Sequence, residues 1–183
     1  WCVLKIFFRV TVVGAENIPK TDGFIVAPNH RSNWDVPVVA CFSSRKLAFM
    51  AKEEMFKLWI TEKLFKSLNA FPIKRGKGDI GAIKAAIRIL QDGHVMLMFP
   101  EGTRNKTGED LPAKPGIAYL AIKGQVPILP VAIKGEYRLF GRIMLQFGKP
   151  IYFSEWYDQK ANGETLQALS NEVLAQIRAM GEK

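Results

Sequence analysis

Short runs rich in β-branched and other apolar residues alternate with longer segments of helical periodicity along this chain. The runs expected to form strands are residues 10–13, 24–27, 47–50, 71–73, 95–99, 128–133 and 143–147. Such alternation is typical of proteins in which helices cover a central sheet. We therefore predict an α/β fold with a mixed, mostly parallel sheet and helices on both of its faces.

Two segments have the clearest helical periodicity. Residues 79–91 place apolar side chains three and four positions apart, and Asp92-Gly93 supplies the stop signal. Residues 164–180 show the same spacing. The apolar positions are Ile80, Ile83, Ile87 and Leu90 in the first segment and Leu166, Leu169, Val173, Ile177 and Met180 in the second. Both helices are expected to pack their apolar face on the sheet.

Size and charge limit the possible functions. A chain of 183 residues, 48% of them hydrophobic, suits one well-packed core, so residues 1–183 are predicted to form a single domain. The formal net charge of +9 predicts attraction to a polyanion, which can be nucleic acid, an anionic membrane or a phosphorylated substrate. Cys2 and Cys41 lie far apart and match no disulfide or zinc pattern, so no metal is expected.

The N-terminal residues bear on membrane attachment. Lys5 and Arg9 interrupt the most apolar run, which falls short of the ~18 consecutive apolar residues of a spanning helix. Because the first residue is Trp1 rather than Met, we expect an N-terminal helix that extends further upstream. The first ten residues suit either a helix at a membrane interface or a core helix. Residues 52–66, which mix lysines with large apolar residues, have the same two interpretations.

The residues after the second predicted strand carry the strongest functional signal. They read Asn-His-Arg-Ser-Asn-Trp-Asp over positions 29–35 and precede an apolar helical segment. If Ser32 or Asn33 caps that helix, Asp35 lies in its first turn and can accept the imidazole N–H of His30. The second ring nitrogen is then free to remove a proton from a hydroxyl. The alternative is a capping box, in which the carboxylate only accepts backbone N–H groups.

Two further loops follow predicted strands and combine charge with glycine. Their candidate residues are Lys74 and Arg75 after the fourth strand and Glu101, Gly102, Thr103 and Arg104 after the fifth. The guanidinium groups of Arg75 and Arg104 suit bidentate binding of a phosphate, to which Lys74 adds charge. Gly102 lets the backbone approach a ligand closely. Each composition also occurs in ordinary turns.

These motifs, with residues 126–131, resemble the four sequence blocks of the glycerolipid acyltransferases. In order they read Asn-His-Arg-Ser-x-x-Asp, Phe-Pro-Ile-x-Arg, Phe-Pro-Glu-Gly-Thr-Arg and Val-Pro-Ile-Leu-Pro-Val. The resemblance covers residues 12–148 and implies a glycerol-3-phosphate acyltransferase-like fold. One segment departs from the family, because Ala113 replaces a Phe and Pro115 is added. The expected shape of the acceptor pocket changes there.

The resemblance implies transfer of a fatty acyl group from a thioester of coenzyme A or acyl carrier protein to the hydroxyl of lysophosphatidic acid. No other cofactor is implied. His30 resembles the family's general base and Asp35 the residue that orients it. The implied acceptor-binding residues are Lys74, Arg75, Glu101, Gly102, Thr103 and Arg104, while Pro130 is expected to shape a substrate channel. The second histidine, His94, is expected in a surface turn and does not compete as a base.

The sequence leaves several functions open. The acceptor can be glycerol-3-phosphate or another lysolipid, and a non-catalytic protein that binds anionic lipid fits the same charge. Nucleic-acid binding is not expected, because no module interleaves exposed aromatic and basic residues. Lipid substrates place the protein at the cytoplasmic face of the cell membrane, peripheral or anchored by upstream residues. Lys74 and the backbone N–H groups near Gly76 or Gly102 are candidate oxyanion donors.

Overall fold

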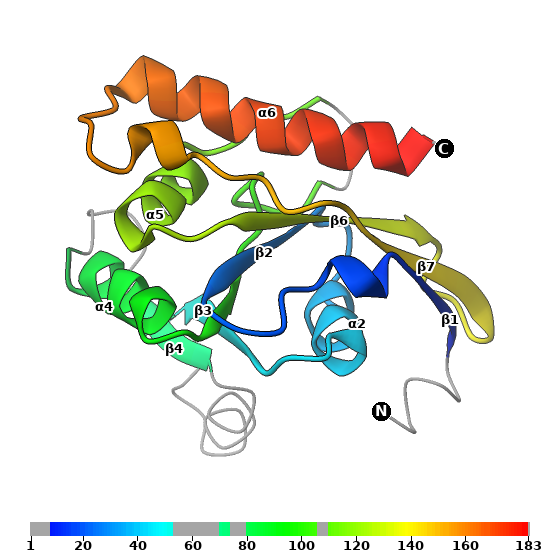
Figure 1. Ribbon diagram of the computed structural model, residues 1–183. Coiled ribbons are helices and arrows are strands. Elements are labelled where there is room, and N and C mark those ends of the chain that lie inside the picture. Colours follow the sequence, from blue (N-terminus) through cyan, green and yellow to red (C-terminus); the bar gives the residue numbers. More distant parts are fainter. Residues whose placement is uncertain (1–7, 53–69, 74–79, 106–109, 183) are drawn as a thin grey trace.

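The computed structural model describes residues 8–52, 70–73, 80–105 and 110–182. Seven strands form one sheet in the order β1-β7-β6-β2-β5-β3-β4 (Figure 1). They are β1 (Phe8–Val13), β2 (Phe24–Pro28), β3 (Leu47–Lys52), β4 (Ala70–Ile73), β5 (Val95–Leu97), β6 (Ile128–Gly135) and β7 (Gly141–Phe147). All neighbouring pairs are parallel except β6 and β7, which form an antiparallel hairpin.

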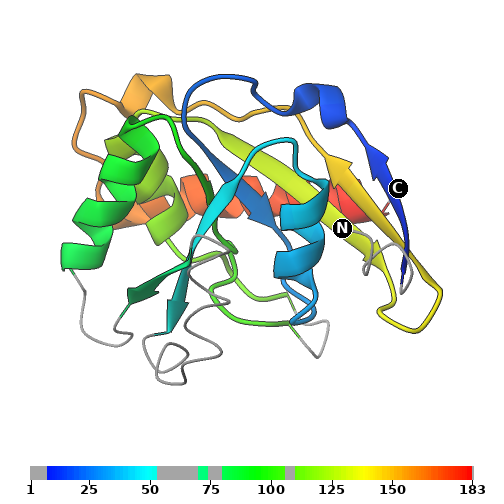
Figure 2. The same cartoon turned by 90° about the horizontal axis from the view of Figure 1, so that it is seen from below.

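Helices cover both faces of this sheet (Figures 1 and 2). They are α2 (Asp35–Phe42), α4 (Ile80–Gln91), α5 (Gly116–Gly124) and α6 (Gly163–Glu182), with the short 3-10 helices η1 (Ala15–Asn17) and η3 (Ser154–Trp156). One buried cluster joins α2 to the sheet, and a second joins α4, α5 and α6 to the opposite face. The predicted α/β fold with a mixed, mostly parallel sheet is therefore confirmed.

Strand β2 shows how the sequence divides between the two cores. All five of its residues are buried, as expected of a central parallel strand covered on both faces. Its side chains alternate, so Phe24 and Val26 join the cluster under α2 while Ile25 and Ala27 join the cluster under α5 and α6. A strand without any polar position can therefore serve two cores at once.

The seven predicted strands and the two helices of clearest periodicity are present, with small differences at their ends. Strand β5 ends at Leu97, two residues before the predicted end. Helix α4 ends at Gln91, and Gly93 then takes a left-handed φ of 81°, which is the predicted stop. Helix α5 was not predicted, because most of its side chains are buried and it lacks the polar face that reveals an amphipathic helix.

The N-terminal helix prediction is wrong for Phe8 and Arg9, which extend the strand predicted for residues 10–13 and begin β1. Phe8 pairs with Gly141 in parallel register with β7, and Phe8 is buried while Arg9 is exposed. This two-residue alternation belongs to a strand at the edge of a sheet. Residues 1–7 and 53–69, on which the predicted membrane-surface helices mostly fall, lie outside the described residues. None of the described helices has the length and hydrophobicity needed to cross a bilayer.

The carboxyl ends of β2, β5 and β6 meet at one edge of the sheet. Strand β2 lies between β5 and β6 and is parallel to both. The chain leaves β2 toward α2 on one face, whereas β6 turns back into β7. Open α/β sheets bind ligands at such an edge, where neighbouring strands send their connections in different directions. The loops after β2, β5 and β6 are therefore the place to look for a site.

Candidate active site

The loop after β2 places His30 next to Asp35, the first residue of α2. The imidazole Nδ1 of His30 lies 2.9 Å from Oδ2 of Asp35. The Asp35 side chain is fully buried, while 17% of the His30 side chain remains exposed. A carboxylate only accepts hydrogen bonds, so Nδ1 is the donor of this contact, and in the neutral form of the ring Nε2 carries the lone pair. The pairing expected from the sequence is therefore formed in the structure.

Four described donors surround the Asp35 carboxylate. Besides His30, the backbone N–H groups of Arg31 and Ser32 each donate to Oδ2 at 2.7 Å, and the Tyr137 hydroxyl donates to Oδ1 at 2.7 Å. One oxygen of Asp35 thus accepts from both the imidazole and the backbone, so the alternative in which the carboxylate accepts only backbone N–H groups is wrong. These hydrogen bonds satisfy the acceptor sites of a carboxylate that water does not reach.

The predicted helix cap is wrong. The residue before α2 is Trp34, not Ser32 or Asn33, and no side chain caps the helix by a hydrogen bond. Instead, the Asp35 carboxylate reaches back to the N–H groups of the preceding loop. The loop after β2 is consequently held by the same side chain that holds the imidazole.

Tyr137 is the site residue that the sequence motifs did not reveal. It lies between β6 and β7, 102 positions from Asp35, and its ring packs edge-on against Phe8 with centroids 5.4 Å apart. Burial, with the neighbouring Asp35 carboxylate, raises the pKa of Tyr137 far above its ordinary value of 10.0. The hydroxyl therefore remains a hydrogen-bond donor throughout the physiological pH range. Only the pairing of β2 with β6 could have revealed the contact.

The loop after β5 fixes the backbone and ring of His30. Its ring stacks on Phe99, with centroids 3.7 Å apart and planes 17° from parallel. The N–H of His30 donates to Oε2 of Glu101 at 3.2 Å, and its carbonyl accepts from the N–H of Asn105 at 2.8 Å. His30 is thus held by Asp35 of α2, which bonds its ring, and by the loop after β5, which contacts both its ring and its backbone.

Glu101 is buried, whereas the three residues that follow it in its motif are exposed. Glu101 is 5% exposed, and burial raises the pKa of its carboxyl, an effect that the N–H of His30 and the charge of Arg178 partly counteract. The structure therefore shows Glu101 supporting the His30 backbone. Gly102 has a left-handed φ of 67°. Gly102, Thr103 and Arg104 are exposed in the structure, which leaves their predicted role in acceptor binding untested.

Three other sequence predictions have different outcomes. Lys74, Arg75 and Gly76 lie outside the described residues, so their role in phosphate or oxyanion binding stays a prediction. Pro130 is buried within β6, where it pairs with Ala27 and its carbonyl accepts the N–H of Gly148. Ala113, at the point where the sequence departs from the family pattern, is 1% exposed.

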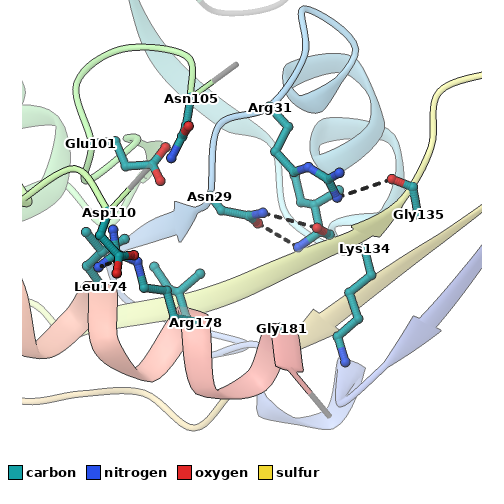
Figure 3. Close-up of a pocket in the computed structure, with 12 residues that line it drawn as sticks. Asn29, Arg31, Glu101, Asn105, Asp110, Lys134, Gly135, Leu174, Arg178 and Gly181 are labelled. Atoms are coloured by element: carbon teal, nitrogen blue, oxygen red, sulfur yellow. Dashed lines mark hydrogen bonds and ion pairs between the residues drawn. The ribbon is translucent and has the colours of Figure 1, made fainter. Parts of the chain in front are cut away.

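A pocket of about 450 Å³ lies beside this loop cluster, against the C-terminal half of α6 (Figure 3). Asn29 crosses its floor, donating to the carbonyl of Ile133 at 3.1 Å and accepting from the same residue's N–H at 2.7 Å. The charged residues that line it are Arg31, Glu101, Asp110, Lys134 and Arg178. Three cations and two carboxylates give this wall a mixed, net positive character.

A sequence profile described as acyltransferase matches residues 9–134, more than two thirds of the chain. The chain belongs to the acyltransferase family. The matched region of this acyltransferase contains His30, Asp35 and Glu101, whereas Tyr137 and α6 lie beyond it. The resemblance noted from the sequence blocks is confirmed.

Three relatives show what the acyltransferase is similar to over most of its length. A 1-acyl-sn-glycerol-3-phosphate acyltransferase of Bacillus subtilis is 31% identical over 188 residues, which cover 99% of this chain and 92% of that protein. A Streptococcus pneumoniae protein of the same name is also 31% identical, over 92% of this chain and 64% of its own length. The crystal structure of the 1-acyl-sn-glycerophosphate acyltransferase PlsC of Thermotoga maritima superimposes with a TM-score of 0.74 at 31% identity, covering 96% of this chain and 73% of that one.

Proposed function

We propose that this acyltransferase moves a fatty acyl group from a thioester to the sn-2 hydroxyl of lysophosphatidic acid, giving phosphatidic acid. The donor is acyl-coenzyme A or acyl carrier protein. The observation that carries the proposal is the 2.9 Å contact between His30 and a fully buried Asp35 in a chain of this family. The names of the relatives from Bacillus subtilis and Streptococcus pneumoniae support the acceptor.

In the proposed mechanism, Nε2 of His30 removes the proton of the acceptor hydroxyl as its oxygen attacks the thioester carbonyl. The C–O bond forms, and the C–S bond then breaks in the tetrahedral intermediate. The imidazolium returns its proton to the leaving sulfur, so the enzyme ends as it began. Asp35, bonded to Nδ1, keeps the ring in the required tautomer and stabilises the imidazolium between the two steps. No covalent acyl-enzyme is required.

The acceptor's phosphate needs cations at the same edge of the sheet. In our proposal Lys74, Arg75 and Arg104 supply them, with Gly102 and Thr103 completing the loop around the acceptor. Glu101 acts through the backbone of His30, to which it is bonded. Because substrate and product both reside in a bilayer, we place the enzyme at the cytoplasmic face of the cell membrane, where its net charge of +9 favours anionic lipid.

Thiol release from acyl-coenzyme A and from acyl carrier protein tests the proposal, with lysophosphatidic acid, glycerol-3-phosphate or no acceptor. Release is expected to require lysophosphatidic acid and to fall by about 10²- to 10⁴-fold in His30→Ala. His94→Ala is the matched control, because this exposed histidine lies outside the site. If release requires glycerol-3-phosphate instead, the acceptor is glycerol-3-phosphate and not lysophosphatidic acid. Equally slow release from wild type and His30→Ala would be background hydrolysis and would overturn the proposal.

A further inference from the structure

The loop that joins β6 to β7 exposes two large apolar side chains between two arginines. Residues 138–142, the hairpin tip, read Arg-Leu-Phe-Gly-Arg. Leu139 is 62% exposed and Phe140 is 59% exposed. The tip lies at the outer rim of the molecule in both views (Figures 1 and 2). Neighbouring large apolar side chains at such exposure mark a surface that contacts something outside the chain.

The backbone of the tip holds these side chains outward. The N–H of Gly141 donates to the carbonyl of Arg138 at 2.8 Å, which closes a turn with Leu139 and Phe140 at its two central positions. Phe140 has a left-handed φ of 59°, a conformation that glycine adopts easily and that is strained for a bulky residue. An exposed phenylalanine gains little from packing to offset that strain. The benefit of the side chain therefore lies in an external contact.

The charges around the tip define the chemistry of that contact. Arg138 and Arg142 flank the apolar pair, and Arg9 stands beside Arg142 in the parallel register of β1 and β7. All three arginines are exposed, and none forms an ion pair with a carboxylate among the described residues. The acidic residue of this loop is Glu136, and the three arginines outweigh it, so the surface around the tip has a net positive charge. Apolar side chains ringed by cations suit a bilayer with anionic headgroups.

The tip also lies on the catalytic edge of the sheet. Strand β6 runs parallel to β2, so the loops after both strands emerge at the same edge. Tyr137 immediately precedes the tip and donates to the Asp35 carboxylate at 2.7 Å. A membrane bound at the tip therefore lies beside the loop that carries His30, where a lipid acceptor has to arrive.

We propose that the hairpin tip is a membrane-docking element that inserts Leu139 and Phe140 between acyl chains and sets Arg138, Arg142 and Arg9 among anionic headgroups. The proposal rests on the proposed function in naming a bilayer as the source of the substrate. It adds a specific surface, which turns the edge of the sheet that carries His30 toward the lipid.

Sedimentation with vesicles tests the docking independently of catalysis. The wild-type protein is compared on vesicles of phosphatidylcholine alone and of phosphatidylcholine mixed with phosphatidylglycerol in equal parts. Phe140→Gly is the decisive variant, because glycine removes the side chain and also suits the backbone at this φ. We expect its affinity for the mixed vesicles to fall roughly tenfold or more. Arg142→Gln is expected to lose about fivefold, and the loss should shrink at high salt.

A matched control lies near the start of β6, the strand that leads into the hairpin tip. Tyr152 is 60% exposed and follows Ile151, which bridges Ile128 at the start of β6. Since β6 has eight residues, this point lies about 25 Å from the end of the strand that carries the tip. Tyr152→Ser is expected to bind vesicles like the wild type. Equal weakening by Tyr152→Ser and Phe140→Gly, or unchanged binding by Phe140→Gly, would overturn the proposal.

Activity in detergent separates this proposal from the proposed function. With lysophosphatidic acid dispersed in a nonionic detergent, no bilayer is present, and Phe140→Gly is expected to transfer acyl groups at the wild-type rate. On vesicles the same variant is expected to be slower by the factor lost in binding. If the wild type transfers no acyl group even in detergent, the proposed function fails, while the sedimentation result still decides the docking. A loss in detergent equal to that on vesicles would contradict the docking role.

Discussion

The substitution Tyr137→Phe removes one hydroxyl and keeps the ring that packs on Phe8. The lost group donates to Oδ1 of Asp35 at 2.7 Å, and because the carboxylate is fully buried, water cannot readily replace it. A hydrogen bond to a charged group contributes about 1.5–3 kcal/mol. We therefore expect the free energy of unfolding to fall by about 2 kcal/mol. For a chain of this size, that corresponds to a melting temperature lower by roughly 4–8 °C.

The same substitution is expected to lower kcat and leave KM unchanged. Three of the four described donors to Asp35 remain, so the carboxylate loosens without leaving its place. Small misplacements of a catalytic group can cost as much as 10²-fold, and for one lost donor we expect about tenfold. Urea unfolding and thiol release measure the two effects, with Tyr119→Phe in α5 as the control. A raised KM with unchanged kcat would refute the reasoning, because Tyr137 would then bind substrate rather than position Asp35.

Two further predictions concern the loops on either side of His30. Because burial raises the pKa of Glu101 above its ordinary value of 4.5, the folded protein holds that proton more tightly than the unfolded chain. Wild-type stability should therefore fall as pH rises from about 4.5 through the folded-state pKa and then level off. Glu101→Gln keeps an acceptor for the N–H of His30, and its stability in urea unfolding should not show this decrease with rising pH. A pH profile identical to that of the wild type would show that Glu101 does not cause the decrease. Asn29→Ala removes both hydrogen bonds to Ile133 and should lower the free energy of unfolding in urea by about 2 kcal/mol. Gln159→Ala, at an exposed amide, should lower it little, and equal effects of the two substitutions would show that Asn29 does not fasten the loop.

Much of the sheet could be predicted because its strands are short, apolar and separated by turn or helical patterns. The five buried residues of β2 illustrate the signal, since an unbroken apolar run that short suits a central strand. Helix α5 escaped prediction for a related reason: buried on nearly every side, it has no polar stripe to set its period. At the N-terminus, Lys5 and Arg9 suggested a helical face, but pairing with β7 makes Phe8 and Arg9 alternate across a strand.

The site shows the same division between local and long-range information. His30 and Asp35 lie five residues apart, so a strand-to-helix turn is enough to bring them together. Glu101 could be recognised as a motif residue, but its contact with the N–H of His30 depends on the pairing of β2 with β5. Tyr137 carries no motif, and its contact depends on the path of β6. Residues that orient the pair from other strands therefore required the structure.

In the proposed mechanism Asp35 acts through His30. A double-mutant cycle on acyl transfer to lysophosphatidic acid tests it directly, using His30→Ala, Asp35→Asn and the double variant, each first shown to be folded. Groups that act as a unit are not additive, so the double variant should be no slower than His30→Ala alone. If Asp35→Asn lowers the rate by the same factor whether or not His30 is present, the carboxylate works independently of the imidazole and the proposed mechanism is wrong.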